Sequence, residues 1–273
     1  MNSASIGVFD SGVGGLSILR EIHVLLPSIN ILYFADQEHV PYGPRSMQEV
    51  RTFSVEISRY LIHHGAKCIV VACNTASAAA LHHLRSNFPE TPFVGMEPAV
   101  KPAASSSQTR IVGVLATPAT FQGELFASVV ERFAQDVRVI EQTVPGLVEQ
   151  IELGRLYHPK TRAMLSEAIL PLIDQGVDTL VLACTHYPLV LHLIREIAGP
   201  NIQVIDPAPA IARQTKRIWD QLFIPPPPSG EVLFFSTGNA EKLQATAKQL
   251  INLSGSIVKV KWHGTQLSTL FQD

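Results

Sequence analysis

The chain has 273 residues, 46% of them hydrophobic and 16% charged, so it can bury a sizeable core and is not disordered over long stretches. Its net charge of −2, without acidic or basic blocks, argues against bulk binding of nucleic acid or anionic lipid. No apolar run reaches the roughly 18 residues that a membrane span requires. The length allows one large α/β domain or two domains of roughly 100–150 residues each.

The cysteine content and the first residues bear on the cellular compartment. Three cysteines are an odd number, and no two of them form a CxxC pair. The segment MNSASIGVFDSG enters a strand pattern at once and lacks the charged and apolar regions of a signal peptide. We therefore expect a reduced, soluble, cytoplasmic protein.

Short apolar runs alternate with helix-length amphipathic segments along the chain. The expected strands, in chain order, are IGVFD (6–10), INILYFAD (29–36), CIVVAC (68–73), TPFVGM (91–96), IVGVLA (111–116), VRVIE (137–141), TLVLAC (179–184) and IQVID (202–206). The expected helices include residues 16–26, 47–65, 77–88, 121–134, 161–176 and 188–199. This alternation is typical of an α/β fold in which helices cover mostly parallel, doubly wound sheets.

Fragments of the first half reappear in the second half at similar separations. The three pairs are IGVFDS (6–11) with VGVLAT (112–117), VVACNT (70–75) with VLACTH (181–186), and, more loosely, VPYG (40–43) with VPG (144–146). Three matches in the same order indicate two related α/β units.

The remainder after about residue 207 departs from this repeat. It contains a helix, the strand EVLFF (231–235), a further helix and the strand IVKVKW (257–262). Because it has no third copy of the strand-end motif, we expect it to pack against one of the two repeated units.

Polar residues gather where the expected strands end. They are Asp10, Ser11, Asp36, Cys73, Asn74, Thr75, Thr117, Thr120, Cys184, Thr185, His186 and Asp206. Open parallel sheets bind ligands outside the carboxyl ends of their strands. If the two units face each other, Cys73 and Cys184 lie on opposite walls of one cleft.

Cys73 and Cys184 occupy matched positions of the repeat, each where a strand gives way to a helical segment. The unperturbed pKa of a thiol is near ~8.5, and helix-end amides or a nearby cation favour the thiolate. One thiol on each side of a carbon can remove a proton from one face and deliver a proton to the other. This arrangement inverts a stereocentre without a metal or a nucleotide. Asp10 and His186, one near each cysteine, are candidates for controlling the protonation of the thiols.

Other features have simpler structural explanations. Cys68 lies inside a strand without polar neighbours, so we expect it in the core. The segment DSGVGGL (10–16) does not fit G-x-G-x-x-G and lacks the lysine of a P-loop, so a tight βα turn explains it as well as a ligand site does. The adjacent pairs His63–His64 and His82–His83 cannot converge on a metal from one helix face, so no metal site is expected.

Six motifs follow one another along the chain. They are DSGVGGL (10–16), AD…VPYG (35–43), ACNTA (72–76), EPAVKPA (97–103), GVLATPAT (113–120) and LACTHYP (182–188). Together and in this order they resemble the bacterial glutamate racemases, within the wider aspartate/glutamate racemase superfamily. The resemblance runs from residue 6 to about residue 210 and departs from the family at Ala183, where glycine is more common.

The resemblance implies a cofactor-independent racemase that interconverts L- and D-glutamate and supplies D-glutamate for peptidoglycan synthesis. By that likeness, Cys73 exchanges the α-proton of D-glutamate and Cys184 that of L-glutamate. Asp10 and His186 would assist them, and Glu152 would orient His186. The implied substrate-binding positions are Asp10, Ser11, Pro41, Tyr42, Gly43, Cys73, Asn74, Thr75, Thr117, Thr120, Cys184, Thr185 and His186.

The resemblance also implies two pseudo-symmetric lobes with the active site in the cleft between them. Residues 1–97 and 207–273 would form the first lobe, and residues 98–206 the second. Glutamate is then the expected partner. Neither nucleic acid nor a membrane is expected to bind, and a homodimer is left open.

Two rival functions remain open from the sequence. A racemase for another acidic amino acid, such as aspartate, would differ in pocket size, which the sequence does not measure. A two-lobed solute-binding module would share the cleft but would have no need of paired thiols. An accessory role, such as binding a topoisomerase, leaves no signature in this sequence.

Overall fold

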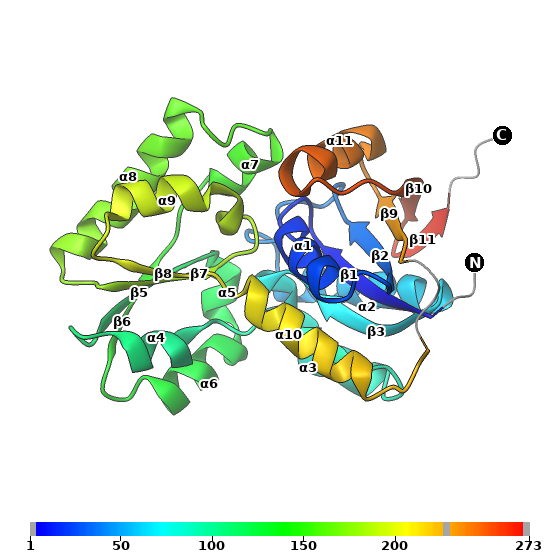
Figure 1. Ribbon diagram of the computed structural model, residues 1–273, viewed down its shortest axis with the longest axis horizontal. Coiled ribbons are helices and arrows are strands. Elements are labelled where there is room, and N and C mark those ends of the chain that lie inside the picture. The colour runs from blue at the N-terminus through cyan, green and yellow to red at the C-terminus, as the bar shows by residue number, and fades with distance from the viewer. Residues whose placement is uncertain (1–3, 226–229, 270–273) are drawn as a thin grey trace.

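The computed structural model describes residues 4–225 and 230–269. Figure 1 shows two lobes side by side, each built around a sheet with helices packed against it. The sheet of the first lobe combines strands from the two ends of the chain, and the sheet of the second lobe uses strands from the middle. The expected α/β class with two mostly parallel lobes is therefore confirmed.

Within the described residues, the first sheet has seven strands in the order β11-β10-β9-β2-β1-β3-β4. Their bounds are β1 (Ser5–Asp10), β2 (Asn30–Ala35), β3 (Ala66–Val71), β4 (Phe93–Gly95), β9 (Val232–Ser236), β10 (Ser256–His263) and β11 (Gln266–Thr269). Neighbouring strands are parallel except β10 and β11, which pair antiparallel. Every residue of β1 is buried, as expected for a central strand with helices on both faces.

The second sheet, in the same described part of the chain, has four parallel strands in the order β6-β5-β7-β8. Their bounds are β5 (Ile111–Ala116), β6 (Arg138–Gln142), β7 (Thr179–Ala183) and β8 (Gln203–Ile205). This order repeats the β2-β1-β3-β4 order of the first sheet. The fragments that echo each other in the sequence lie at equivalent places, since β1 corresponds to β5 and β3 to β7. The predicted internal repeat is thus confirmed.

Helices cover the sheets of both lobes (Figure 1). They are α1 (Leu16–Leu25), α2 (Met47–His63), α3 (Asn74–Asn87), α4 (Val100–Ser106), α5 (Pro118–Gln122), α6 (Glu124–Phe133), α7 (Leu147–Glu152), α8 (Pro159–Asp174), the 3₁₀ turn η1 (Tyr187–Val190), α9 (Leu191–Ala198), α10 (Ala208–Asp220) and α11 (Ala240–Ile251). The short helices α4 and α7 were not among the predicted elements.

The single helix predicted over residues 121–134 is wrong. Two helices, α5 and α6, meet at Gly123, whose backbone is extended (φ −76°, ψ 138°). A Cβ atom at Gly123 would lie 2.6 Å from the Cβ of Ala78 on α3. The break therefore lets the second lobe approach a helix of the first lobe, a tertiary contact that a helical pattern does not encode.

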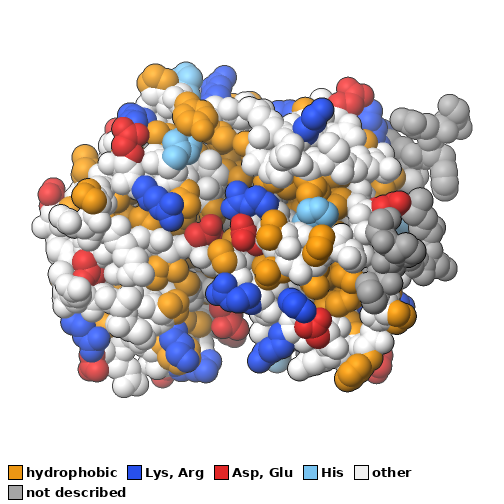
Figure 2. All heavy atoms as spheres, viewed as in Figure 1, with side chains coloured by type: hydrophobic (Ala, Val, Ile, Leu, Met, Phe, Trp, Pro, Cys, Tyr) orange, Lys and Arg blue, Asp and Glu red, His pale blue; other side chains and the backbone are white. Residues whose placement is uncertain are grey.

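The C-terminal part of the chain packs against the first lobe. β9 pairs in parallel with β2 from Ile31 opposite Val232 to Ala35 opposite Ser236. The chain then turns back in the antiparallel pair of β10 and β11, of which the sequence predicted only the first strand. No helix in the described part of the chain is long and apolar enough to cross a membrane. Figure 2 shows both signs of charge interspersed over the visible face, in agreement with the small net charge.

Candidate active site

Chemically reactive side chains lie where strands of both sheets end. Asp10 is the last residue of β1, and Cys73 follows β3 after one intervening residue. In the second lobe, Thr117 directly follows β5 and Cys184 directly follows β7. The carboxyl ends of parallel strands share one edge of each sheet, so these residues come from equivalent edges of the two lobes.

Cys73 of the first lobe and Cys184 of the second lobe line one small cavity between the lobes, which we call the inner cavity. Both thiols are almost buried, with exposed fractions of 5% and 6%, and neither forms a disulfide. The cavity volume is about 20 Å³, enough for about one water molecule. Its lining residues are Ser11, Pro41, Tyr42, Gly43, Cys73, Asn74, Thr75, Thr117, Val148, Cys184, Thr185 and His186.

Three predicted site residues lie one layer behind this lining. Each of them makes a hydrogen bond with a residue that lines the inner cavity. The pairs, with the distances between their side-chain polar atoms, are Asp10–Thr185 (2.9 Å), Thr120–Thr117 (3.0 Å) and Glu152–His186 (2.6 Å). These three residues therefore act on a ligand through the side chains in front of them or through their charges.

Cys73 is the N-cap residue of α3. Its Sγ accepts a hydrogen bond from the backbone N–H of Ala76 at 3.4 Å, the helix-end contact that the sequence predicted. Burial nevertheless raises the pKa of the Cys73 thiol well above its ordinary range, and the negative charge of Asp10 raises it further. The helix amides oppose this shift without overcoming it, so Cys73 is a protonated thiol in the ligand-free protein.

His186 lies between Cys184 and a buried carboxylate. Burial by itself lowers the pKa of His186, but hydrogen bonds to Cys184 and Glu152, with the charges of Glu152 and Asp10, raise it well above 6.5. Burial raises the pKa of Glu152, yet its bonds to His186 and to the Val13 N–H bring the net value below 4.5. An imidazolium–carboxylate pair therefore stands beside Cys184.

Asp10 is fully buried near Cys73. Its Oδ1 accepts from the backbone N–H of Gly12 at 2.8 Å, and its Oδ2 accepts from Thr185 Oγ1 at 2.9 Å. Burial raises the pKa of Asp10 above 3.8, against the charge of His186 and these two hydrogen bonds. The bond to Thr185 connects the first lobe to the second directly behind the inner cavity.

The glycines of DSGVGGL allow this segment to contact the opposite lobe. A Cβ atom at Gly12 would lie 1.9 Å from Glu152 Oε1. A Cβ atom at Gly14 would lie 2.6 Å from His186 Nδ1 and 2.7 Å from Thr185 Oγ1. The segment is thus both a tight βα turn and part of the site, because only residues without side chains fit against the imidazolium pair.

Two further groups of the lining carry hydrogen-bonding capacity. Thr75 Oγ1 of the first lobe lies 2.9 Å from Thr117 Oγ1 of the second lobe, so hydroxyls meet across the cleft. Both polar atoms of the Asn74 amide are buried and have no hydrogen-bond partner among the described residues. Buried amides are nearly always paired, so the Asn74 amide is the group that a ligand with donors and acceptors would satisfy.

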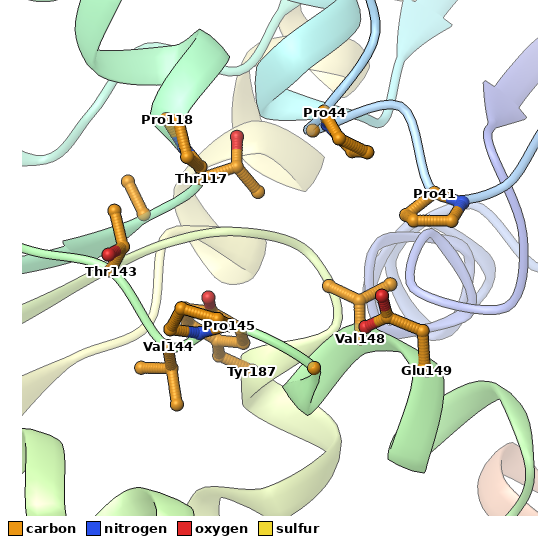
Figure 3. Close-up of a pocket in the computed structure, with 13 residues that line it drawn as sticks. Pro41, Pro44, Thr117, Pro118, Thr143, Val144, Pro145, Val148, Glu149 and Tyr187 are labelled. Carbon is orange, nitrogen blue, oxygen red and sulfur yellow. The ribbon is translucent and has the colours of Figure 1, made fainter.

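A larger, mostly apolar pocket adjoins the inner cavity (Figure 3). This outer pocket has a volume of about 190 Å³. It shares Pro41, Gly43, Thr117 and Val148 with the lining of the inner cavity. In Figure 3 Thr117 and Pro118 face the pocket from one side, and Val144, Pro145 and two residues of α7, Val148 and Glu149, face it from the other. The outer pocket therefore lies between the lobes, next to the inner cavity.

Residues 6–215 match the family described as Asp/Glu/Hydantoin racemase. The chain belongs to this racemase family. It is similar to a glutamate racemase from Roseiflexus sp. (strain RS-1), with 55% identity over 213 residues that cover 78% of each chain.

Two solved structures extend this finding to the fold. A glutamate racemase isoform from Bacillus anthracis has a TM-score of 0.87 at 30% identity, covering 97% of this chain and 100% of that one. Escherichia coli glutamate racemase, in complex with L-glutamate and the activator UDP-MurNAc-ala, has a TM-score of 0.83 at 29% identity, covering 98% and 100% of the two chains. The family resemblance predicted from the motifs is confirmed, and the alternative of a solute-binding module is not supported.

Among the described residues that line the inner cavity, Val148 is the one that sequence reasoning missed. It lies on α7, a helix of six residues that the apolar pattern did not reveal. Its side chain carries no reactive group, so no chemical argument singles it out. The internal repeat nevertheless indicated that this region lies near the site. The segment before α7, VPG (144–146), is the counterpart of VPYG (40–43), which contributes Pro41, Tyr42 and Gly43 to the lining.

Proposed function

We propose that this racemase interconverts L- and D-glutamate without a cofactor, by proton transfer through two thiols. The observation that carries the proposal is that Cys73 and Cys184, from equivalent positions of the two lobes, line the same inner cavity. The D-glutamate that it forms would supply peptidoglycan synthesis.

The proton balance follows from one thiol on each side of the α-carbon. In the L-to-D direction, Cys184 as a thiolate takes the α-proton, and the electron pair of the C–H bond stays on carbon. Cys73 as a thiol then gives its proton to the opposite face and becomes the thiolate. The D-to-L direction exchanges the two roles. The protonated state of Cys73 in the ligand-free protein is the state that a proton donor requires.

The residues behind the two thiols act differently on the two possible thiolates. The imidazolium of His186 offsets the negative charge of a thiolate at Cys184, and Glu152 holds the imidazole ring in place through the 2.6 Å hydrogen bond. Asp10 opposes a thiolate at Cys73 as long as its own charge is not offset. The α-ammonium group of glutamate is the cation that would offset it.

Substrate binding is assigned to the polar lining of the inner cavity. The unpaired amide of Asn74 can accept from the α-ammonium group and donate to a carboxylate. A carboxylate is also favoured at the N-terminus of α3, where the first-turn N–H groups are free of helical partners. Hydroxyls complete the set; they come from Ser11, Thr75, Thr117 and Thr185.

Glutamate can enter only after the lobes separate. A cavity of about 20 Å³ holds about one water molecule, far less than an amino acid needs. The Thr75–Thr117 hydroxyl contact closes the cleft and would be replaced by contacts with the substrate. The outer pocket, which shares four lining residues with the inner cavity, is the proposed route of entry.

Glutamate is proposed over aspartate because the relatives described above are glutamate racemases, and the Escherichia coli protein was solved with L-glutamate. Circular dichroism of each enantiomer, mixed with the purified protein without added cofactor, tests the activity. We expect L- and D-glutamate both to lose their signal, and L-aspartate to lose it at least about tenfold more slowly.

The third cysteine provides a matched control for the two thiols. Cys68 is fully buried within β3, and burial raises its pKa to about 12. A Cys68→Ala protein should racemise glutamate at nearly the normal rate, whereas Cys73→Ala and Cys184→Ala should each lose at least about 10³-fold in kcat. Racemisation by either of the latter variants at the wild-type rate would refute the two-thiol proposal.

Three further expectations complete the proposal. We propose the lobe boundaries 1–97 with 207–273 and 98–206, supported by the pairing of β9 with β2 in the first sheet. A cytoplasmic location is proposed because a two-thiol reaction needs both cysteines reduced. The homodimer stays a prediction, which light scattering of the purified protein tests.

A further inference from the structure

Asp36, which directly follows β2, holds a fully buried carboxylate that accepts four hydrogen bonds. Its four partner atoms are His39 Nδ1 (2.9 Å), Tyr42 Oη (2.6 Å), Thr237 Oγ1 (2.9 Å) and Trp262 Nε1 (2.8 Å). A carboxylate has about four lone-pair directions, so this group is saturated. Asp36 does not line the inner cavity, and the proposed reaction does not use it.

The two oxygens of Asp36 serve different parts of the chain. Oδ2 accepts from His39 and Tyr42, both in the segment 37–45 that we call the site loop. Oδ1 accepts from Thr237, just after β9, and from Trp262 in β10. One buried carboxylate thus joins the C-terminal strands to the site loop.

The site loop carries Pro41, Tyr42 and Gly43, which line the inner cavity. Tyr42 is fully buried, and burial together with the charge of Asp36 raises the pKa of its phenol well above 10.0. The phenol therefore stays protonated and donates to Asp36. The position of this part of the cavity wall depends on where the Asp36 carboxylate is held.

The C-terminal strands reach the site loop by two more contacts. Thr237 Oγ1 accepts from the backbone N–H of Glu38 at 3.0 Å while it donates to Asp36. The Trp262 ring meets the His39 ring edge-on at 5.2 Å, and His39 stacks on Phe53 of α2 at 3.9 Å. The loop is therefore held between α2 and the C-terminal strands.

We infer that Thr237 and Trp262 are positioning residues for substrate binding, which act through Asp36 on the Pro41–Gly43 part of the site loop. The inference rests on the proposed glutamate racemase function. Removing either donor leaves a lone pair of Oδ1 unpaired in a buried site, which is unfavourable, and a rotation of the carboxylate toward its remaining donors would reduce that cost. Such a rotation moves Oδ2 and, with it, Tyr42 and the cavity wall.

The test uses two variants that each remove one donor to Asp36, Thr237→Val and Trp262→Phe. The first is nearly isosteric but also removes the acceptor of the Glu38 N–H, and the second also makes the ring that meets His39 smaller. The cavity wall contacts the substrate in both the ground state and the transition state, so its displacement weakens binding without a specific effect on the chemical step. We expect KM for L- and D-glutamate to rise about tenfold in each variant, with kcat within about twofold of wild type. Thr237→Ser, which keeps the hydroxyl, should restore the wild-type KM.

Tyr60→Phe is the matched control. It removes another hydrogen bond to the C-terminal strands, the 2.7 Å contact of Tyr60 Oη with Thr269 Oγ1, without touching Asp36. It should lower the melting temperature but leave KM unchanged. If Thr237→Val and Trp262→Phe also leave KM unchanged, or if Tyr60→Phe raises KM as much as they do, the inference is overturned while the proposed function stands. A wild-type protein that fails to racemise glutamate would overturn both.

Discussion

The two thiols of the inner cavity have neighbours of opposite charge. Asp10 lies near Cys73, and the imidazolium of His186 lies beside Cys184. A symmetric pair of thiols would have no preferred donor, whereas these neighbours favour a protonated Cys73 in the ligand-free protein. The asymmetry arises from buried residues, of which Asp10 and Glu152 do not line the cavity at all.

The hydrogen bond between Glu152 and His186 gives the first residue-scale prediction. Glu152→Gln keeps the shape of the side chain but removes the charge that favours the imidazolium. We expect kcat/KM to fall about 10- to 100-fold and equally in both directions, because the two enantiomers have the same free energy. At saturating glutamate, kcat should fall more in the L-to-D direction, where Cys184 is the base, with a matching fall in KM for L-glutamate. Initial rates of both directions by circular dichroism measure this effect. Equal losses of kcat at saturating glutamate in the two directions would contradict the assignment of His186 to Cys184.

The same pair predicts a pH dependence of stability. The pKa of His186 is raised in the folded state, so its contribution to stability is full below about 6.5 and is lost as the pH rises through the folded-state value. The pKa of Glu152 is lowered, so its contribution is present above about 4.5 and is lost in acid. Urea unfolding should therefore separate wild type from Glu152→Gln more at about pH 6 than at about pH 9. A difference in unfolding free energy that grows toward alkaline pH would refute this.

Gly12 tests whether the DSGVGGL segment belongs to the site. Gly12→Ala places a Cβ atom against Glu152 Oε1 and should displace that carboxylate from His186, with a loss of about 1–3 kcal/mol in stability and a lower kcat. In a Glu152→Ala background the clash is absent, so adding Gly12→Ala should lower the stability and kcat little further. Additive effects in this double-mutant cycle would show that Gly12 acts independently of Glu152.

At the scale of the elements, helix α3 begins at a residue with two roles: Cys73 is its N-cap and also one of the two proposed catalytic thiols. Cys73 caps the helix through its sulfur, and serine is a better N-cap than most residues. Cys73→Ser should therefore keep or raise the melting temperature while racemisation falls at least about 10³-fold. Thermal unfolding and rate measurements on the same sample separate the two effects. A variant that loses activity together with several degrees of melting temperature would point to a folding role.

The sequence predicted the long elements and the strand ends well, for reasons that are local. The strand predicted at residues 111–116 coincides with β5, and the helix predicted at 47–65 nearly coincides with α2, because buried strands and long amphipathic helices have strong periodic patterns. The break at Gly123 escaped prediction because it depends on Ala78, a residue of the other lobe. Short α7 escaped because six residues carry too little periodicity.

At the scale of the whole molecule, the internal repeat predicted which residues would meet. Equivalent strand ends placed Cys73 and Cys184 in one cavity, and that pairing needed no knowledge of side-chain positions. The links between distant segments could not be predicted in the same way. Asp36 accepts a hydrogen bond from Thr237, which lies about 200 positions further along the chain. No motif or periodicity in the sequence indicates this bond.

Opening and closing of the lobes gives the whole-molecule prediction. The Val13 N–H donates to Glu152 across the cleft, so its hydrogen exchange reports closure. Saturating glutamate, once the lobes have closed on it, should keep this hydrogen bond formed for longer and slow the exchange. The amide of Leu32, inside β2, is a control that should not change. Equal exchange at Val13 with and without glutamate would mean that the lobes do not close on the substrate.

The most direct test of the two-thiol account follows the α-hydrogen. Protiated L-glutamate is incubated with the wild-type protein in D₂O, and the two enantiomers are separated at low conversion. If one thiol removes the proton and a different one delivers it, the D-glutamate formed carries deuterium at Cα while the remaining L-glutamate keeps its protium. Early D-glutamate that retains the original protium would show that a single group returns the same proton, and would contradict the opposed roles of Cys73 and Cys184.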